Sequence, residues 1–314
     1  ALKAQAVCAR SYAYIQMMHN KYEAYGAHVD DSVNFQVYNK QNQTPETVAA
    51  VDETKGQVLS YKGDIIETYY YSTSYGHTGD YEAWNLDKDA YGYLQGVWVR
   101  SEENPIDLSD EKSFLDYISN VDSACYESDL KYFRWNTVLD FQGKDETLLH
   151  TITDRKEHQP EAISYYKDAS KTETTDSCSN FGSLQAINVV KRNQSGVILE
   201  LELEFQNGAV SVQSEYNMRA ILGCGITNIN LLDGSSVEMS ILPSAYISIQ
   251  AKGDGTYAVL GGGYGHGIGM SQNGAQKLCV QGFDYKRILN YFYQDTELTE
   301  LYQPQNKTKE EGGA

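Results

Sequence analysis

One stretch in the second half of the chain constrains the fold most. From Gln185 to Ser214 apolar and polar residues alternate, and glycine-containing pairs at Ser195–Gly196 and Asn207–Gly208 interrupt the alternation. A period of two is typical of strands that bury one face, and such pairs are typical of hairpin turns. The stretch therefore predicts three antiparallel strands with one face open to solvent.

Helical patterns lie on both sides of these strands. The opening ALKAQAVCARSYAYIQMMHNKY carries apolar residues every three to four positions, as in a helix with one buried stripe, which we expect to be Leu2, Ala6, Ala9, Ala13 and Met17. Thr44 before Pro45 predicts the start of a second helix, Gly223 the end of a short one, and Asp284 the cap of a closing one. Helices and mostly antiparallel strands in mixed order indicate an α+β fold with mixed sheets and packed helices.

The chain of 314 residues is longer than one average domain, and its apolar residues recur less regularly in the middle than at either end. Residues 100–182 are acidic and weakly patterned, with a helix near 114–119 and a strand in YFRWNTVLDF, so we predict a peripheral insertion or second lobe. It separates the two parts of a common core, 1–99 and 183–302. Residues 303–314 have too few apolar residues to fold and are predicted to be a disordered tail.

Composition argues against several functions. The formal net charge of −18, without clustered Lys and Arg, argues against nucleic acid as a partner. No apolar run is long enough to span a membrane. The cysteines lie far apart without the spacing of a metal site, and a disulfide between Cys125 and Cys178 remains open. The 26 tyrosines suit stacking on sugar rings as well as ordinary core packing.

The stretch GGGYGHGIGMSQNGAQ, from Gly261 to Gln276, concentrates glycine around His266. It lacks the Lys of a phosphate loop and the acidic partner of a dinucleotide site, and His266 has no second ligand at metal spacing. Glycine permits close approach of backbones, and Ser271 is placed to cap a helix. The stretch is expected to form either a wall of a binding site or a close contact with another strand.

A second polar motif, YYYSTSYGHTGDYEAW, follows a predicted strand. Its hydroxyl and imidazole side chains are Ser72, Thr73, Ser74, His77 and Thr78. Hydroxyls beside aromatic Tyr75 and Trp84 are typical of sugar-binding clefts. A Ser–His nucleophile would need a G-x-S-x-G elbow and an orienting Asp, which the motif lacks. A solvated loop is the alternative.

Three of these stretches together resemble one family. ALKAQAVCARSYA, YYYSTSYGHTGDYEAWN and GYGHGIGMSQNGAQ with GFDYKRILNYFY are similar in order and spacing to the SpoIID family of sporulation peptidoglycan-cleaving proteins and to its relatives, the LytB-type amidase enhancers. The resemblance covers essentially the whole chain. It implies a central sugar-binding cleft and a lytic transglycosylase that cuts the MurNAc–GlcNAc bond of peptide-stripped glycan strands, leaving a 1,6-anhydro end.

The resemblance also implies an extracytoplasmic protein of cell-wall remodelling, secreted or anchored through a segment outside this chain. Its partners would be peptidoglycan glycan strands, with a cell-wall amidase as an open second partner, and no cofactor is expected. Two alternatives remain: a non-catalytic enhancer of an amidase, and a carbohydrate-binding wall protein.

In the family a single Glu immediately before ALKAQAV is the general acid, because the 6-hydroxyl of the sugar closes on the anomeric carbon and no second carboxylate is needed. This Glu is expected just upstream of Ala1, which agrees with a first helix that has no capping residue. The chain by itself is therefore expected to be inert.

Other roles carry over by position. The resemblance implies supporting catalytic roles for Lys3, Arg10, Asp80 and Glu82. It implies substrate contacts from Gln5, Ser72, Ser74, His77, Thr78, His266, Ser271 and Gln272. Tyr75 replaces the first glycine of the family's STSGGHT, which leaves the conformation of that loop and one sugar subsite open.

One departure concerns zinc. Sporulation-type members bind it through His and Cys in the segment that matches GAHVDDSVNFQVY, where this chain has Asp30, Asn34 and Phe35 in place of Cys, His and Cys. Only His28 remains as a ligand candidate. We expect no metal site, a loop held by Phe35 and Tyr38, and a vegetative rather than a sporulation relative.

Overall fold

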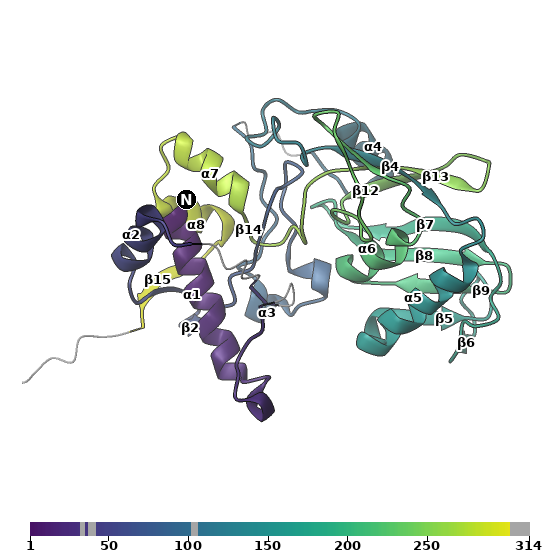
Figure 1. Cartoon of the computed structure of the whole chain (residues 1–314), viewed down its shortest axis with the longest axis horizontal. Coiled ribbons are helices and arrows are strands. Elements are labelled where there is room, and N and C mark those ends of the chain that lie inside the picture. The colour runs from purple at the N-terminus through teal and green to yellow at the C-terminus, as the bar shows by residue number, and fades with distance from the viewer. Residues whose placement is uncertain (32–34, 37–41, 102–105, 302–314) are drawn as a thin grey trace, which may run out of the picture.

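The computed structural model describes residues 1–31, 35–36, 42–101 and 106–301. Two hydrophobic cores form within them, and the ribbon divides accordingly (Figure 1). The first core gathers around α1, α7 and α8, and the second lies among antiparallel sheets and two helices. The predicted tail at 303–314 lies outside the described residues.

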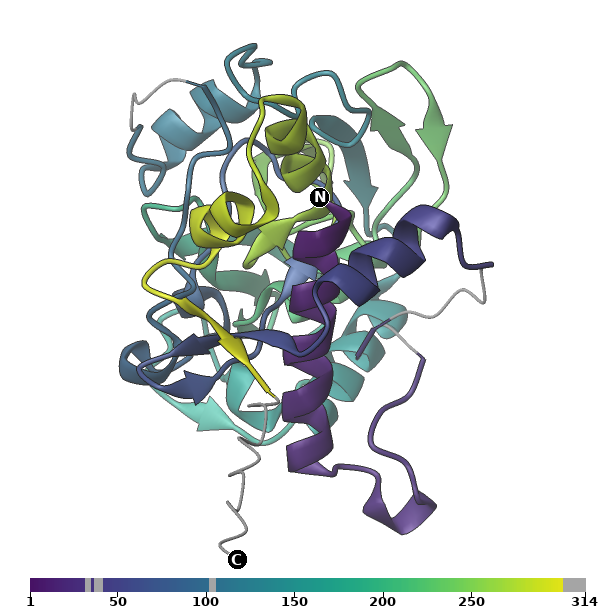
Figure 2. The ribbon, with the colours of Figure 1, turned by 90° about the vertical axis from the view of Figure 1, so that its left-hand side faces the viewer.

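The first core is built by helices that pack around a small three-stranded sheet. The helix α1 is confirmed, but the expected buried stripe of Leu2, Ala6, Ala9, Ala13 and Met17 is wrong. Leu2 and Met17 are each 48% exposed, and the buried apolar side chains of the helix include Ala4, Val7 and Cys8. Thr44 caps the second helix with Pro45 at its first position, which is also confirmed. Figure 2 shows α1 with α2 beside it. The elements are α1 (Leu2–His19), α2 (Pro45–Glu53), β1 (Gln57–Tyr61), β2 (Asp64–Ile65), β3 (Tyr70–Tyr71), the 3-10 helix η2 (Tyr81–Trp84), α3 (Lys88–Tyr91), α4 (Glu111–Ile118), β14 (Met270–Ser271), α7 (Gln272–Val280), α8 (Tyr285–Phe292) and β15 (Glu297–Glu300).

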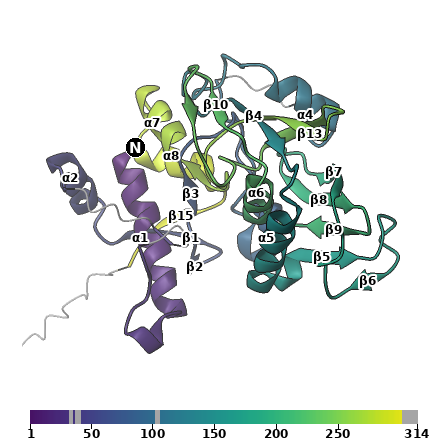
Figure 3. The same ribbon diagram turned by 45° about the vertical axis from the view of Figure 1, so that its right-hand side comes forward.

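The alternating stretch forms the antiparallel strands β7, β8 and β9, which confirms the prediction from periodicity. They belong to a five-stranded sheet of order β6-β5-β9-β8-β7, and a second sheet has the order β11-β10-β4-β13-β12. Helices α5 and α6 lie side by side against the first of these sheets (Figure 3). The elements are β4 (Trp135–Asp140), α5 (Asp145–His158), β5 (Ile163–Tyr166), β6 (Thr174–Thr175), β7 (Leu184–Arg192), β8 (Ile198–Phe205), β9 (Gly208–Val212), α6 (Glu215–Gly223), β10 (Ile229–Leu231), β11 (Ser236–Val237), β12 (Ile247–Ala251) and β13 (Thr256–Gly261).

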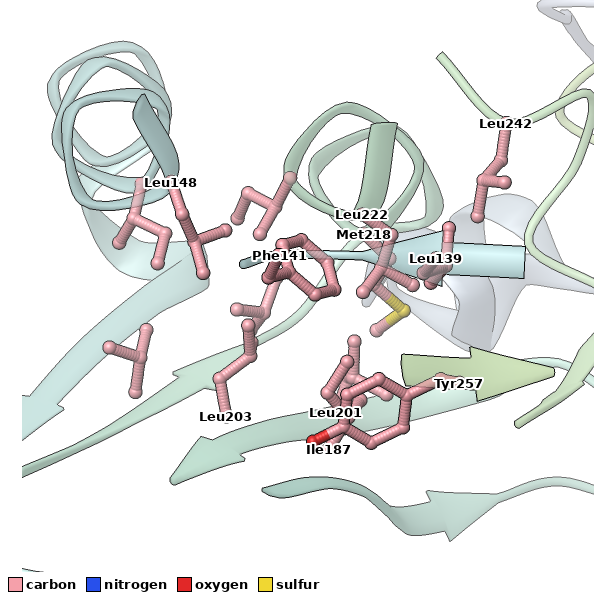
Figure 4. Close-up of a cluster of buried hydrophobic side chains, with 14 of the residues drawn as sticks. Leu139, Phe141, Leu148, Ile187, Leu201, Leu203, Met218, Leu222, Leu242 and Tyr257 are labelled. Atoms are coloured by element: carbon pink, nitrogen blue, oxygen red, sulfur yellow. The ribbon is translucent and has the colours of Figure 1, made fainter. Parts of the chain in front are cut away.

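The second core is the apolar cluster of these sheets and helices. Figure 4 shows Leu148 of α5 and Met218 of α6 facing Leu201 and Leu203 of β8. The prediction that all three strands expose one face to solvent is wrong for β9. This strand lies between β5 and β8 and is buried along its whole length. The α+β class is confirmed by these antiparallel sheets and their packed helices.

The boundaries at 100 and 182 stay predictions, and the residues between them contribute to both cores. Residues 108–118 pack into the first core, whereas 135–181 supply much of the second. Strand β4 is central, because it pairs with both β10 and β13. The helix α5 was not predicted, since only Leu148 and Ile152 of its largely polar sequence are buried.

Two polar joints connect the cores. Arg192 of β7, whose side chain is fully buried, binds both carboxylate oxygens of Glu111 of α4, at 2.6 and 2.9 Å. Asp80 beside η2 accepts hydrogen bonds from Asn193 Nδ2 at 2.9 Å and from Ser195 Oγ at 2.7 Å. The turn between β7 and β8 is thus held against the first core from two sides.

All five cysteines are free thiols, so the open disulfide between Cys125 and Cys178 is not formed. Cys125 lies 3.4 Å from the Tyr117 hydroxyl, while Cys178 lies 3.6 Å from the Thr153 hydroxyl. Within the described ranges, no helix has both the length and the apolar content needed to cross a membrane.

Candidate functional site: an aromatic cleft between the two cores

A cleft with a volume of about 490 Å³ lies where elements of the two cores meet. Aromatic rings dominate its walls, with a few polar groups between them. The first-core wall consists of Tyr12, Phe35, Gln36, Thr68, Tyr69, Tyr70, Ser72 and Trp84, and the facing wall of Glu215, Tyr216, Arg219, Met239 and Ile241, with Tyr264, Gly265 and His266 completing the lining. Rings with sparse hydroxyl, amide and charged groups suit the faces and edges of sugars.

The glycine stretch leads from β13 along this cleft to β14, so it is both a wall and a close backbone contact. At Gly265, where φ is +114°, a Cβ would lie 2.8 Å from the Tyr71 Cβ. At Gly269, where φ is +77°, it would lie 2.2 Å from the Tyr69 carbonyl oxygen. Glycine is required at both places by conformation and by space. Ser271 caps α7 by accepting from the Gly274 N–H at 3.1 Å, as predicted.

His266 lines the cleft, but both of its ring nitrogens bind backbone. Nδ1 accepts from the Ile268 N–H at 3.1 Å, so the proton is on Nε2 and is donated to the Tyr70 carbonyl at 2.9 Å. Burial lowers the pKa of His266 to about 4, which keeps the ring neutral. The centroid of the imidazole lies 5.1 Å from that of the Trp84 ring. The group that His266 presents to a ligand is therefore the edge of an uncharged aromatic ring.

The hydroxyl-rich motif is divided between the cleft and the interior. Ser72 lines the cleft, whereas Ser74, His77 and Thr78 are buried. His77 Nδ1 lies 2.6 Å from the Thr78 carbonyl, and burial lowers the pKa of His77 to about 4. Of the four motif residues predicted to contact substrate, the structure places only Ser72 at the cleft surface.

Tyr75, which replaces the first glycine of the family's STSGGHT, lies in the first core. Its ring is fully buried, stacks 4.5 Å from Tyr246, and its hydroxyl donates to the Ser195 carbonyl at 2.6 Å. The extra bulk fills the first core and takes no part in lining the cleft.

A buried carboxyl, which sequence reasoning missed, joins the two motifs behind the cleft. Glu127 accepts hydrogen bonds from Ser74 Oγ, from the Ser74 N–H at 3.0 Å and from Ser271 Oγ at 2.7 Å. Burial raises the pKa of Glu127 to about 7. Glu127 lies in the weakly patterned stretch, and no motif there marks it. Ser74 and Ser271 are therefore bound to a common anchor rather than facing the cleft.

The predicted residues of the first helix also have structural partners. Lys3 forms an ion pair with Glu53 of α2, and Arg10 Nη1 donates to the Thr54 and Gln57 carbonyls at 2.7 and 2.8 Å. These contacts fix α2 and the start of β1 against α1. Gln5 and Gln272 do meet, since Gln272 Nε2 donates to Gln5 Oε1 at 3.2 Å and joins the first helix to the glycine stretch.

Asp80 and Glu82 lie in the joint between the cores. Asp80 is held by Asn193 and Ser195, and burial raises its pKa. Glu82 accepts from Asn193 Nδ2 at 3.1 Å and lines a second hollow, of about 1150 Å³, that shares Trp84 with the cleft. Neither carboxylate lines the cleft itself.

The facing wall carries charged residues that sequence reasoning read only as a short helix. Glu215 and Arg219 of α6 form an ion pair of 3.0 Å with side-chain exposures of 6% and 11%. Ser214, just before the helix, has the unusual φ of +68°. A strained non-glycine residue beside a buried ion pair is a signal of a functional site, but it is visible only in the structure.

The loop compared with zinc-binding relatives is partly described. Phe35 packs 5.6 Å from Tyr22 and lines the cleft, while Asp30 accepts from the Tyr22 hydroxyl at 2.8 Å. Asn34 and Tyr38 lie outside the described residues. The described part of the chain has no group of three or more His, Cys, Asp or Glu that could hold a metal ion. The expectation that this protein binds no zinc stays a prediction.

Fold and site thus define an α+β protein with two cores and an aromatic cleft between them. The family model described as stage II sporulation protein matches residues 1–61, and a model described as a domain of unknown function (DUF8618) matches 77–269. This chain therefore carries the DUF8618 domain over most of its length, and the match of its first 61 residues and the names of its relatives support the SpoIID/LytB family, which is related to sporulation and the cell wall.

Several known proteins are similar to almost the whole of this chain. The amidase enhancer of Bacillus subtilis is 27% identical over 95% of this chain and 38% of its own length. An uncharacterised protein of Brachyspira hyodysenteriae is 24% identical over 96% of this chain and 61% of its own. The stage II sporulation protein D of Bacillus subtilis is 25% identical over 96% and 68%. The chain spans less than two thirds of the first two relatives.

Proposed function

We propose that this chain is the glycan-binding part of an extracytoplasmic cell-wall protein that cleaves peptidoglycan strands as a lytic transglycosylase. The observation that carries the proposal is the cleft of about 490 Å³ between the cores, whose lining includes Tyr12, Tyr69 and Trp84 from one part of the chain and Tyr216 of α6 from another. Rings on opposing walls hold a strand of sugars by stacking, and hydroxyl and amide groups such as Ser72 and Gln36 bind its edges.

The chemistry needs one proton donor. By resemblance it is a Glu at the position before Ala1, where α1 begins and where Gln5 meets Gln272. The acid would protonate the leaving oxygen as the bond from C1 to that oxygen breaks. The resulting carboxylate would then take the proton of the 6-hydroxyl of the muramic residue as this hydroxyl attacks C1 and closes the anhydro ring, so no water enters. Of the described residues in the cleft lining, only Glu215 carries a carboxyl. Its ion pair suits it to stabilise positive charge on the sugar ring rather than to donate a proton.

The test uses the full-length gene product and peptide-free glycan strands, with mass spectrometry of the products. We expect fragments that end in 1,6-anhydromuramic acid, and their loss when the residue before Ala1 is replaced by Gln. Reducing ends formed by water, or no cleavage by a protein that still binds the strands, would reject the transglycosylase.

A second candidate is an enhancer of a cell-wall amidase, favoured by the name of the Bacillus subtilis relative. An enhancer would bind glycan in the same cleft without cutting it and would raise the rate of a partner amidase on intact wall. The same digest, repeated with an added amidase, separates the two. A faster release of peptides without anhydro ends supports the enhancer.

A further inference from the structure

One cation faces the cleft. Among the described lining residues Arg219 is the only Lys or Arg, and His266 is held neutral by its backbone contacts and lowered pKa. An uncharged sugar strand needs no buried guanidinium, and the chain as a whole has a formal charge of −18. The position of Arg219 therefore requires a reason beyond stacking.

The guanidinium is fixed in direction. Nε donates to the Leu242 carbonyl at 2.9 Å, and Nη1 donates to Glu215 Oε2 at 3.0 Å. No hydrogen bond is recorded for Nη2 within the described part of the chain, while the side chain borders the cleft. A guanidinium held by two of its nitrogens presents the remaining donors at a defined place, which suits an oxygen pair on a ligand.

Peptidoglycan offers one group that matches. N-acetylmuramic acid carries a 3-O-lactyl side chain that ends in a free carboxylate when no peptide is attached and in an uncharged amide when a stem peptide is present. N-acetylglucosamine carries neither. An Arg beside a wall of rings distinguishes these forms by charge, whereas the rings contact all of them alike.

We propose that Arg219 is a specificity-determining residue that binds the free lactyl carboxylate of peptide-stripped muramic acid. The inference rests on the proposed function, because it assigns a sugar strand to the same cleft. A charge-assisted hydrogen bond to a carboxylate favours the free acid over its amide by about tenfold to a hundredfold in affinity.

The experiment is calorimetric titration of the full-length protein with two matched tetrasaccharides of GlcNAc and MurNAc, one with free lactyl carboxylates and one with these carboxylates converted to methylamides. The wild type is expected to bind the acid at least about tenfold more tightly. In Arg219→Gln this preference for the free acid disappears. Arg287→Gln, the same charge change at an exposed position on α8, keeps the preference.

Arg219→Gln leaves the carboxylate of Glu215 buried without its partner, so the double variant Glu215→Gln/Arg219→Gln is measured as well. A preference for the free acid that survives in the double variant overturns the inference. Equal affinity of the wild type for both ligands also overturns the inference about Arg219, but it agrees with the proposal that the cleft binds glycan. Binding of neither ligand rejects the proposed function, and the inference falls with it.

Discussion

At the scale of single residues, His266 lines the cleft and at the same time supports the fold. Its two backbone hydrogen bonds tie β3 to the glycine stretch, and its ring fills the space beside Trp84. We expect His266→Ala to lower the free energy of unfolding by about 2–3 kcal/mol at pH 7, because two buried backbone groups lose their partners. Urea denaturation measures this loss.

The pH dependence gives an independent check of the same residue. Because the pKa of His266 falls from 6.5 to about 4 on folding, the unfolded chain binds a proton that the folded chain excludes. The stability that depends on the neutral ring is present above pH 6.5 and is lost as the pH falls toward about 4. The gap between wild type and His266→Ala should therefore narrow in acid. A constant gap, or a variant of wild-type stability, would contradict this assignment.

At the scale of elements, Glu127 joins the end of β3 to the start of α7. Its pKa is raised from 4.5 to about 7, so the folded chain holds a proton that the unfolded chain releases, and stability falls as the pH rises through that window. Glu127→Gln removes this penalty. Relative to wild type, the variant should gain roughly 3 kcal/mol between pH 4.5 and pH 8.

Chemical denaturation at several pH values measures the difference. Glu127→Ala is the control, since it loses the hydrogen bonds of Ser74 and Ser271 and should be less stable than Glu127→Gln at every pH. Parallel stability curves for wild type and Glu127→Gln would show that the carboxyl keeps an ordinary pKa.

The joint between α4 and β7 depends on one guanidinium. Arg192 binds Glu111 with two nitrogens and also donates to the Gly196 and Ile247 carbonyls at 2.9 Å. Lysine cannot reproduce this fork, so Arg192→Lys should cost about 2–4 kcal/mol of unfolding free energy. Arg287→Lys at an exposed position serves as the control. Equal stability of the two variants would mean that the joint contributes little.

Elements with strong local signals could be predicted from the sequence. The period-two stretch predicts β7, β8 and β9, and the Thr44–Pro45 and Asp284 caps predict α2 and α8. The helix α5 could not be predicted, because only Leu148 and Ile152 of its largely polar sequence are buried and they do not make a recognisable apolar pattern. The central place of β4 depends on two partners that are both far away in the sequence, β10 and β13.

At the scale of the whole molecule, the site could be predicted in part. The two conspicuous motifs do meet, and Ser72 and His266 line the cleft as expected. The facing wall escaped prediction because Glu215 and Arg219 become neighbours of those motifs only when the second core folds against the first. Conversely, Ser74 and Ser271 were expected to contact substrate. The sequence alone does not distinguish a polar residue that binds a buried carboxyl from one that binds a sugar.

The central claim is that the cleft between the cores binds a glycan strand, and Trp84 tests it most directly. Its ring borders both the cleft and the adjoining hollow. Calorimetry with the peptide-free GlcNAc–MurNAc tetrasaccharide should give clear binding by the wild type and about tenfold weaker binding by Trp84→Ala, through the loss of a stacking surface. Trp98→Phe, a change outside the cleft lining, should bind as the wild type does. No binding by the wild type, or equal binding by Trp84→Ala, would contradict the claim.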